Sequence, residues 1–161
     1  MSSLKVAVLR LFGARIGRGV KIKPAVQIKF PWRLKIGAYS WIGEQVWIDN
    51  LAEVSIGDNC CISQGAYFCT GNHDRFRETF DLLVQPIVLQ SHVWVCAHAI
   101  VGPGVTIGEG AALSLGSVAV KNLKPWSIYS GNPATRVSDR RFQPEAENLP
   151  ANLPSREANP A

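Results

Sequence analysis

The sequence predicts an all-β protein whose short strands wind into a parallel β-helix. Three observations predict this fold: an apolar residue recurs at every sixth position, a glycine often follows it directly, and the position four residues further on is small or apolar in most units. A period of six fits neither the 3.6-residue repeat of an α-helix nor a hairpin meander. It fits short strands joined by turns, with one side chain per unit pointing into a narrow core. Because three units close one triangular coil, we expect about five coils.

The repeat positions begin at Ile16, and their spacing predicts the irregularities of the coil. Thirteen of the fifteen positions are Ile, Leu or Val, although these residue types make up only 40 of the 161 residues. The spacing widens to eight residues twice, which predicts corner insertions at 31–32 and 51–52. It widens to twenty-one residues once, which predicts a long loop ejected from the prism over residues 70–86. The positions are Ile16, Ile22, Ile28, Ile36, Ile42, Ile48, Ile56, Ile62, Phe68, Leu89, Val95, Val101, Ile107, Leu113 and Ala119.

Composition and charge exclude several classes of protein. The chain is 47% hydrophobic and 18% charged, which suffices for one core and is too apolar for a largely disordered protein. No apolar stretch approaches the roughly 20 residues of a membrane span. Residues 1–35 hold nine Lys or Arg and no acid, while the remainder holds eight against twelve acids, a balance of −4. A solvated rim of charges, an anionic membrane or phosphorylated glycolipid, and nucleic acid are each compatible with this basic end.

The two ends of the chain are expected to lie outside the repeats. We expect residues 1–15 to form a short N-terminal cap, residues 16–138 the β-helix domain, and residues 139–161 an irregular, flexible tail. The N-terminus makes a poor signal peptide, so a cytoplasmic location with reduced thiols is expected. The four cysteines lack metal-ligand spacing and are interpreted as small buried hydrophobic residues. They are Cys60, Cys61, Cys69 and Cys96.

Five motifs along the repeats carry a more specific signature: Ile36-Gly37 through Ile48-Asp49-Asn50, Ile56-Gly57-Asp58-Asn59, Cys69-Thr70-Gly71-Asn72-His73-Asp74, Val101-Gly102-Pro103-Gly104-Val105-Thr106-Ile107-Gly108, and Gly131-Asn132-Pro133-Ala134. In this order they resemble the hexapeptide-repeat acyltransferases, above all the colanic-acid or exopolysaccharide acetyltransferases and their galactoside, maltose and nodulation relatives. The resemblance covers about residues 9–138. It implies a left-handed β-helix, whereas general connection rules favour right-handed crossovers.

The same resemblance implies an activity and its partners. It implies an acetyl-CoA-dependent O-acetyltransferase, with acetyl-CoA as acyl donor and no metal, acting on a sugar hydroxyl of a saccharide or glycolipid precursor in surface polysaccharide biosynthesis. The working form would be a homotrimer with each cleft shared between adjacent chains. The acceptor would be a saccharide or lipid-linked saccharide, the basic N-terminal third could contact a membrane peripherally, and no nucleic acid is expected. The alternatives are an amino-sugar N-acetyltransferase, a γ-carbonic-anhydrase-like zinc enzyme and a non-catalytic β-helix scaffold.

His73 is the candidate general base. It lies in the polar setting of the ejected loop, and an imidazole that titrates near neutrality can take a proton from an attacking hydroxyl. The match to the family's catalytic histidine supports this role. The group that orients the imidazole is open: Asp49 and Asn50 are candidates, as are a backbone carbonyl and, less favourably, Asp74.

A second group of residues would hold the acyl donor, by resemblance. Trp94 would line the cleft beside the pantetheine arm, and the backbone N–H of Ala97 would polarise the thioester carbonyl. Cationic side chains suit the phosphates of the cofactor. The remaining residues are Leu115 and Gly116 through their backbone, then Lys121, Asn132, Pro133 and Arg136, with Arg140 or Arg141 as alternatives to Arg136.

His92 and His98 need separate consideration because γ-type carbonic anhydrases bind zinc through three histidines. Those ligands include a pair five residues apart, whereas His92 and His98 are six apart and fall on different faces of the expected prism. We interpret both as surface or corner residues.

Overall fold

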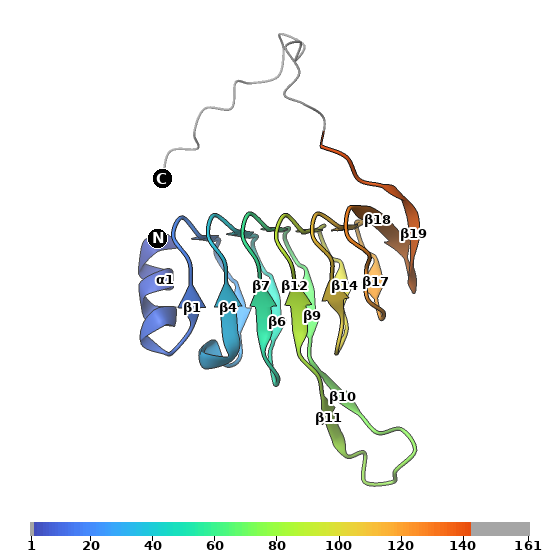
Figure 1. Cartoon of the computed structure of the whole chain (residues 1–161). Helices are drawn as coiled ribbons and strands as arrows, with labels where there is room; N and C mark the ends of the chain where they lie inside the picture. The colour runs from blue at the N-terminus through green and yellow to red at the C-terminus, as the bar shows by residue number, and fades with distance from the viewer. Residues whose placement is uncertain (1, 143–161) are drawn as a thin grey trace.

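The computed structural model describes residues 2–142 and shows a triangular prism of stacked coils preceded by one helix, α1 (Ser2–Leu11) (Figure 1). The strands of each face pair in parallel with those one coil away. The first face contains β1 (Arg15–Ile16), β4 (Leu34–Ile36), β7 (Val54–Ile56), β12 (Ile87–Leu89) and β15 (Thr106–Ile107). The second contains β2 (Lys21–Ile22), β5 (Trp41–Ile42), β8 (Cys61–Ile62), β13 (Trp94–Val95), β16 (Ala112–Leu113), β18 (Ser127–Gly131) and the antiparallel β19 (Ala134–Asp139). The third contains β3 (Gln27–Ile28), β6 (Trp47–Asp49), β9 (Tyr67–Cys69), β14 (Ile100–Val101) and β17 (Val118–Ala119).

The predicted coil number and the first predicted insertion are confirmed. The first and third faces each have five strands, so five coils are complete. A sixth begins, because Leu123 bridges Ile107 in parallel and β18 pairs with β16 on the second face. The insertion at 31–32 lies in a 3-10 turn, η1 (Pro31–Arg33), at a corner.

The repeat positions form the core, as the six-residue period predicts. Fourteen of the fifteen are buried, and seven, including Phe68 and Leu113, are wholly shielded from solvent. Fully burying an aliphatic or aromatic side chain stabilises the fold by about 1.5–3 kcal/mol. The exception is Ile28 in the first coil, which is only half-buried because it borders a groove beside α1.

Left-handed backbone conformations recur at two corners and stack from coil to coil. Between the first and second faces the φ angles are 51° to 68°, at Gly19, Tyr39, Asn59, His92, Gly110 and Trp126. Between the second and third faces they are 55° to 66°, at Ala25, Gln45, Gly65, His98 and Gly116. His92 and His98 are therefore corner residues in different columns. At Gly65 a side chain is also excluded by space, since an added Cβ would lie 2.5 Å from the His98 ring.

The segment expected as a loop over residues 70–86 leaves the prism as predicted, but most of it is an antiparallel ribbon. β10 (Gly71–His73) pairs with β11 (Leu82–Val84), and His73 lies opposite Leu82. The ribbon projects from the corner between the third and first faces (Figure 1). None of the side chains of these two strands is buried, so the ribbon adds no core position to the repeat and the hexapeptide period does not reveal it.

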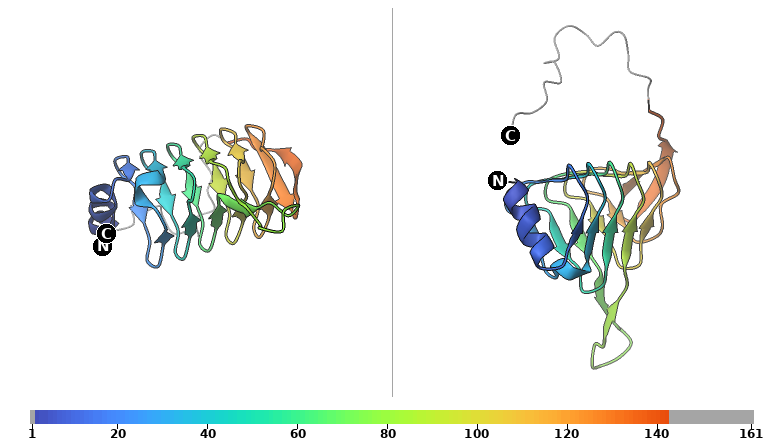
Figure 2. Two further views of the ribbon diagram at one scale, coloured as in Figure 1. Left: turned by 90° about the horizontal axis from the view of Figure 1, so that it is seen from below. Right: turned by 60° about the vertical axis from the view of Figure 1, so that its left-hand side comes forward.

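Helix α1 lies across the open end of the first coil (Figure 2). Val6 on its inner face is buried. The Oγ of Ser2 accepts a hydrogen bond from Ile22 N at 2.9 Å, and Lys5 Nζ donates to Lys23 O at 2.8 Å. These contacts satisfy backbone groups that an end coil otherwise leaves unpaired. Within residues 2–142 there is no helix with the length and apolar character needed to cross a membrane.

At the opposite end, β18 and β19 form an antiparallel pair over the last coil. Arg140 donates to the carbonyl oxygens of His92, Gly110 and Ala111 at 2.9, 3.0 and 3.3 Å. The ring of Phe142 packs edge-on against Trp126 at 5.2 Å. Of the segment expected to form a flexible tail, residues 139–142 are described and make these contacts, and the remainder, 143–161, lies outside the described residues.

Candidate active site

His73 is exposed at the end of β10, and its imidazole is held by the backbone of the opposite side of the ribbon. Nδ1 lies 2.6 Å from the carbonyl oxygen of Phe80. A carbonyl only accepts, so Nδ1 carries the proton and donates it. Nε2 then carries the lone pair and can accept a proton from a substrate.

The ribbon beyond His73 is tied together by its own polar groups. Asp74 N donates to Asp81 O at 2.9 Å, and Phe80 N donates to Arg77 O at 3.1 Å. The Arg77 guanidinium lies between the carboxylates of Asp74 and Asp81, at 3.7 and 3.4 Å. Thr79 Oγ1 donates to Asp81 Oδ1 at 2.6 Å. Asp74 thus contacts Arg77 and helps to place the carbonyl group of Phe80. This carbonyl is the backbone group that contacts His73, one of the alternatives considered for orienting the imidazole.

The two candidates expected to orient His73 have other partners within the chain. Asn50 is fully buried, its Oδ1 accepting from Phe30 N at 2.9 Å and its Nδ2 donating to Phe30 O at 2.7 Å. Asp49 lies 3.1 Å from Lys29 Nζ and accepts from the Tyr67 hydroxyl at 3.5 Å. Burial, then Cys69 and the negative Asp49, raise the pKa of Tyr67, so its hydroxyl stays protonated. Asn50 is a bridge between coils, and Asp49 pairs its largely buried carboxylate with the half-exposed Lys29.

Trp94 lies on the second face with its indole partly exposed. Its Nε1 donates to Ser63 Oγ at 3.0 Å, which fixes the ring against the neighbouring coil. Ser63 carries no signal in the sequence motifs. The register of the repeats places Cys61 beside Trp94, which brings the hydroxyl of Ser63, two residues later, within reach of the indole.

Ala97, Leu115 and Gly116 meet at the corner between the second and third faces. Gly116 N donates to Ala97 O at 3.0 Å, so the two predicted backbone sites are adjacent in successive coils. The N–H of Ala97 donates to no group within the part of the chain that the structure describes. Leu115 is exposed, and an added Cβ at Gly116 would meet nothing within 4 Å, so this corner presents an open surface.

A groove of about 400 Å³ lies beneath the ribbon, at the corner between the third and first faces. Asn72 and Arg75 of the ribbon line one side, and Pro103 and Val120 of later coils line the other. Lys121 directly follows Val120 and is exposed.

The remaining predicted donor-binding residues lie at the last coil. Asn132 and Pro133 form the exposed turn between β18 and β19. Arg136 contacts Ser127 Oγ at 3.1 Å and pairs with Asp139. Arg140 is engaged with backbone carbonyls, whereas Arg141 is exposed. Of the three arginines, Arg140 is the one whose guanidinium links the end of the chain to backbone carbonyls of earlier coils.

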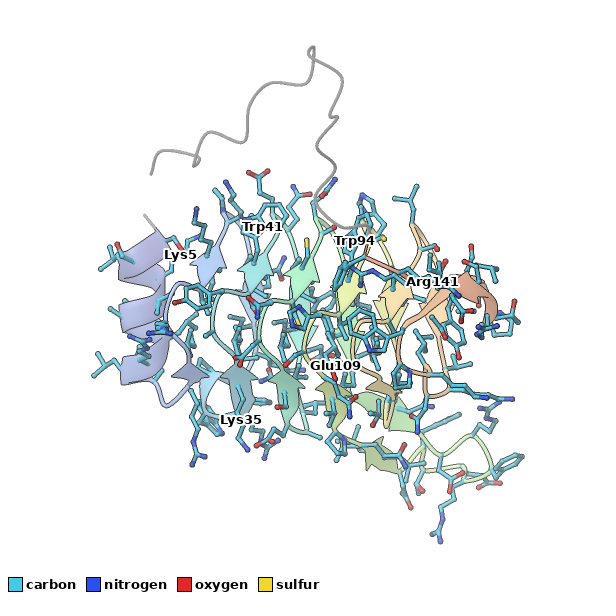
Figure 3. The ribbon with its side chains drawn as sticks, turned by 45° about the horizontal axis from the view of Figure 1, so that its top comes forward. Lys5, Lys35, Trp41, Trp94, Glu109 and Arg141 are labelled. Carbon is cyan, nitrogen blue, oxygen red and sulfur yellow. The ribbon has the colours of Figure 1, made fainter. Side chains whose placement is uncertain are left out.

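The predicted catalytic base lies on a different side of the chain from Trp94 and Ala97, although Lys121 follows a residue that lines the groove beneath the ribbon. His73 comes from the corner between the third and first faces, whereas Trp94 lies on the second face and Ala97 at its far corner. In Figure 3 Trp94 lies on the upper side of the prism and the ribbon at its lower side. Within a single chain, His73 therefore does not meet Trp94 or Ala97.

Burial keeps three cysteines protonated. It raises the pKa of Cys60 to about 11 and raises the pKa values of Cys61 and Cys96. The thiolate is the nucleophilic form, so none of the three is suited to carry an acyl group. Cys60 is buried as predicted, but Cys61, Cys69 and Cys96 are only half-buried. Among residues 2–142 no cluster of three or more His, Cys, Asp or Glu could hold a metal ion.

Comparison with known proteins identifies the family. No protein-family model matches the chain. The colanic acid biosynthesis acetyltransferase WcaF of Escherichia coli K12 is 41% identical over 133 residues, which cover 83% of this chain and 73% of that protein. The galactoside O-acetyltransferase of the same organism is 28% identical over 78% of this chain and 64% of its own length.

Solved structures show the same fold. The hexapeptide-repeat acetyltransferase of Vibrio cholerae, solved in complex with acetyl coenzyme A, superposes with a TM-score of 0.82 at 23% identity, covering 88% of this chain and 79% of its own. The coils are thus those of a left-handed parallel β-helix. Given this fold and the 41% identity to the E. coli protein, the chain is an acyltransferase and belongs to the hexapeptide-repeat acetyltransferases, in the family of the colanic acid biosynthesis acetyltransferase.

Proposed function

We propose that this protein transfers the acetyl group of acetyl-CoA to a sugar hydroxyl of a saccharide or glycolipid precursor. The observation that carries the proposal is the bond from His73 Nδ1 to Phe80 O, which leaves Nε2 as a proton acceptor on an exposed ribbon. The relatives point the same way, since one is named for colanic acid biosynthesis and another for galactoside O-acetylation. The four free thiols are consistent with a reaction in the cytosol.

The chemistry is a direct transfer between two bound substrates. His73 Nε2 takes the proton of the acceptor hydroxyl while the oxygen attacks the thioester carbonyl. The free N–H of Ala97 donates to the oxyanion that develops on that carbonyl. As the tetrahedral intermediate collapses, the carbon–sulfur bond breaks and the imidazolium returns its proton to the departing sulfur. Trp94 and the Leu115–Gly116 corner would flank the pantetheine arm, with Lys121, Asn132, Pro133 and Arg136 toward the phosphates.

We further propose that the working form is a homotrimer. Because His73 and Trp94 lie on different sides of one prism, a complete site needs His73 of one chain and Trp94 of the next. Cyclic symmetry of three chains provides three such clefts. Within its own chain Asp49 contacts Lys29 and Tyr67 and not His73. A role for Asp49 in orienting a catalytic imidazole would therefore concern His73 of a neighbouring chain.

The first experiment is a calorimetric titration of the protein with acetyl-CoA, because it needs no knowledge of the acceptor. We expect one site per chain with micromolar to sub-millimolar affinity. Release of free CoA thiol would then be followed with neutral and amino sugars and their phosphorylated forms. His73→Ala should lower turnover by about 10² to 10⁴-fold with acetyl-CoA binding retained.

Each alternative gives a different result. Turnover confined to amino sugars would identify an N-acetyltransferase. Stoichiometric zinc in the active protein would favour a hydratase, and no acetyl-CoA binding at all would favour a scaffold.

A further inference from the structure

The α1 end of the prism, defined as α1 with the first coil and residues 29–35, carries a concentration of unpaired positive charge. Of the nine Lys and Arg in residues 1–35, only Lys29 and Lys35 lie within 4 Å of a carboxylate among the described residues, at Asp49 and Glu53. The first acid in the sequence is Glu44. The other seven cations therefore add their positive charge at one end of the molecule without a neutralising carboxylate within 4 Å among the described residues.

The same end exposes apolar side chains in a helical pattern. Leu4, Val8 and Leu11 are 69%, 45% and 83% exposed, and their spacing of four and three residues places them on one face of α1. Val6 and Leu9 pack on the first coil, and Leu4 and Val8 also border the groove between the helix and that coil. Phe12 and Trp32, both more than half exposed, extend the apolar surface beyond the helix.

A groove separates α1 from the first coil. Its volume is about 380 Å³, and Val26 and Ile28 form its floor, with Lys5 at its edge. This groove explains why Ile28 is the one repeat position that is not fully buried. The end therefore combines exposed aliphatic residues, an apolar recess and an excess of cations, of which only Lys29 and Lys35 pair with acids among the described residues.

We propose that the α1 end docks on an anionic membrane surface. A helix with an apolar outer face flanked by Lys and Arg lies in the lipid interface, where apolar burial and attraction to anionic headgroups add. Nucleic acid would account for the charge, but a phosphate backbone gives no reason for a stripe of exposed Leu and Val. Charge complementarity and the apolar stripe together favour lipid.

Docking would also set the height of the active site. The ribbon that carries His73 leaves the prism between the third and fourth coils, roughly 10–15 Å from the first at 4.8 Å per coil. A sugar on a lipid carrier projects from the bilayer on this scale. This step, unlike the docking itself, rests on the proposed function.

Vesicle flotation with the full 161-residue protein tests the proposal without acetyl-CoA or acceptor. We expect binding to vesicles of phosphatidylcholine with about one-third phosphatidylglycerol, weak binding to phosphatidylcholine alone, and marked loss between ~0.05 M and ~0.5 M salt. Absence of binding to anionic vesicles would overturn the proposal. Binding to a DNA duplex but not to vesicles would replace lipid by nucleic acid.

Paired variants locate the surface. Arg15→Gln/Lys21→Gln removes two exposed cations of the first coil and should weaken vesicle binding by about fivefold for each charge. Lys124→Gln/Arg141→Gln removes the same net charge from the far end, where Figure 3 shows Arg141 opposite Lys5, and should leave binding almost unchanged. Equal losses in both pairs would mean that net charge alone drives binding.

The apolar contribution has its own pair. Leu11→Gln should weaken vesicle binding on the order of tenfold, since it removes an aliphatic side chain from the lipid interface. Val137→Gln, an exposed apolar residue on β19, should have no effect. Unchanged binding by Leu11→Gln would contradict insertion of α1. Because acetyl-CoA plays no part here, failure of docking and failure of the transferase assay are separate results.

Discussion

The imidazole of His73 on β10 is held by the backbone carbonyl of Phe80, just before β11, with Nδ1 and the oxygen 2.6 Å apart. The partner is a main-chain atom, so side-chain substitution at residue 80 does not remove it. What can be changed is the set of bonds that places this carbonyl. Asp81 contributes most of them, through Thr79 and Arg77.

Asp81→Ala should therefore lower turnover by on the order of tenfold while acetyl-CoA affinity stays constant, because it loosens the Phe80 carbonyl and with it the imidazole. The matched control is Glu53→Ala, which breaks a similarly exposed ion pair, with Lys35, away from the ribbon. Both substitutions should change the free energy of unfolding by less than about 1 kcal/mol. Steady-state kinetics and calorimetry check this; equal turnover in the two variants would argue against a positioning role for Asp81.

Asn50→Ala should lower the free energy of unfolding by about 2 kcal/mol, since it leaves both backbone groups of Phe30 without partners in a buried setting. The turnover of the folded variant should stay near that of the original protein. Asn122→Ala, which removes an exposed bond to Thr106 N, should lose less stability. Urea unfolding measures both; a large loss of turnover without loss of stability would instead make Asn50 part of the catalytic machinery.

Mixed trimers test whether the site is shared. Co-expression of His73→Ala chains with Trp94→Ala chains should restore about a quarter of the original activity, because in random assembly about one cleft in four joins an intact His73 to an intact Trp94 of its neighbour. Each variant alone should be strongly impaired. No recovery in purified mixed trimers would mean that both residues of a site come from one chain.

Alkaline stability should depend on Cys60. Burial raises its pKa from 9.0 to about 11, so between these values the unfolded chain releases a proton that the folded chain keeps. This contribution to stability is complete below pH 9 and is lost as pH rises toward 11, by up to about 2 kcal/mol. Cys60→Ala should therefore show a shallower fall in the free energy of unfolding across this range. Chemical denaturation at several pH values measures the difference, and parallel curves would contradict it.

The six-residue period determined the fold almost completely, because each repeat position makes the same contact one coil later. Ile62 and Phe68 could be placed in the core from sequence spacing alone, and the break after Phe68 marked where the chain leaves the prism. The corner positions could be predicted as well, because His92 and His98 are six residues apart and so occupy equivalent positions in successive repeat units. The sequence also singled out His73, although the comparison with its family's motif was needed to interpret it.

Tertiary structure decided which groups meet across coils and across the ribbon. The carbonyl of Phe80 has no side-chain signature, so its contact with His73 could not be anticipated. Asn50 is a candidate in the sequence for orienting His73, and stacking on the preceding coil brings its side chain to Phe30, twenty residues earlier. Arg140, for which the repeat predicts no position, contacts carbonyls 29 to 48 residues earlier. A local pattern specifies what repeats, whereas hydrogen bonds between distant backbone atoms depend on the register that only the assembled coils establish.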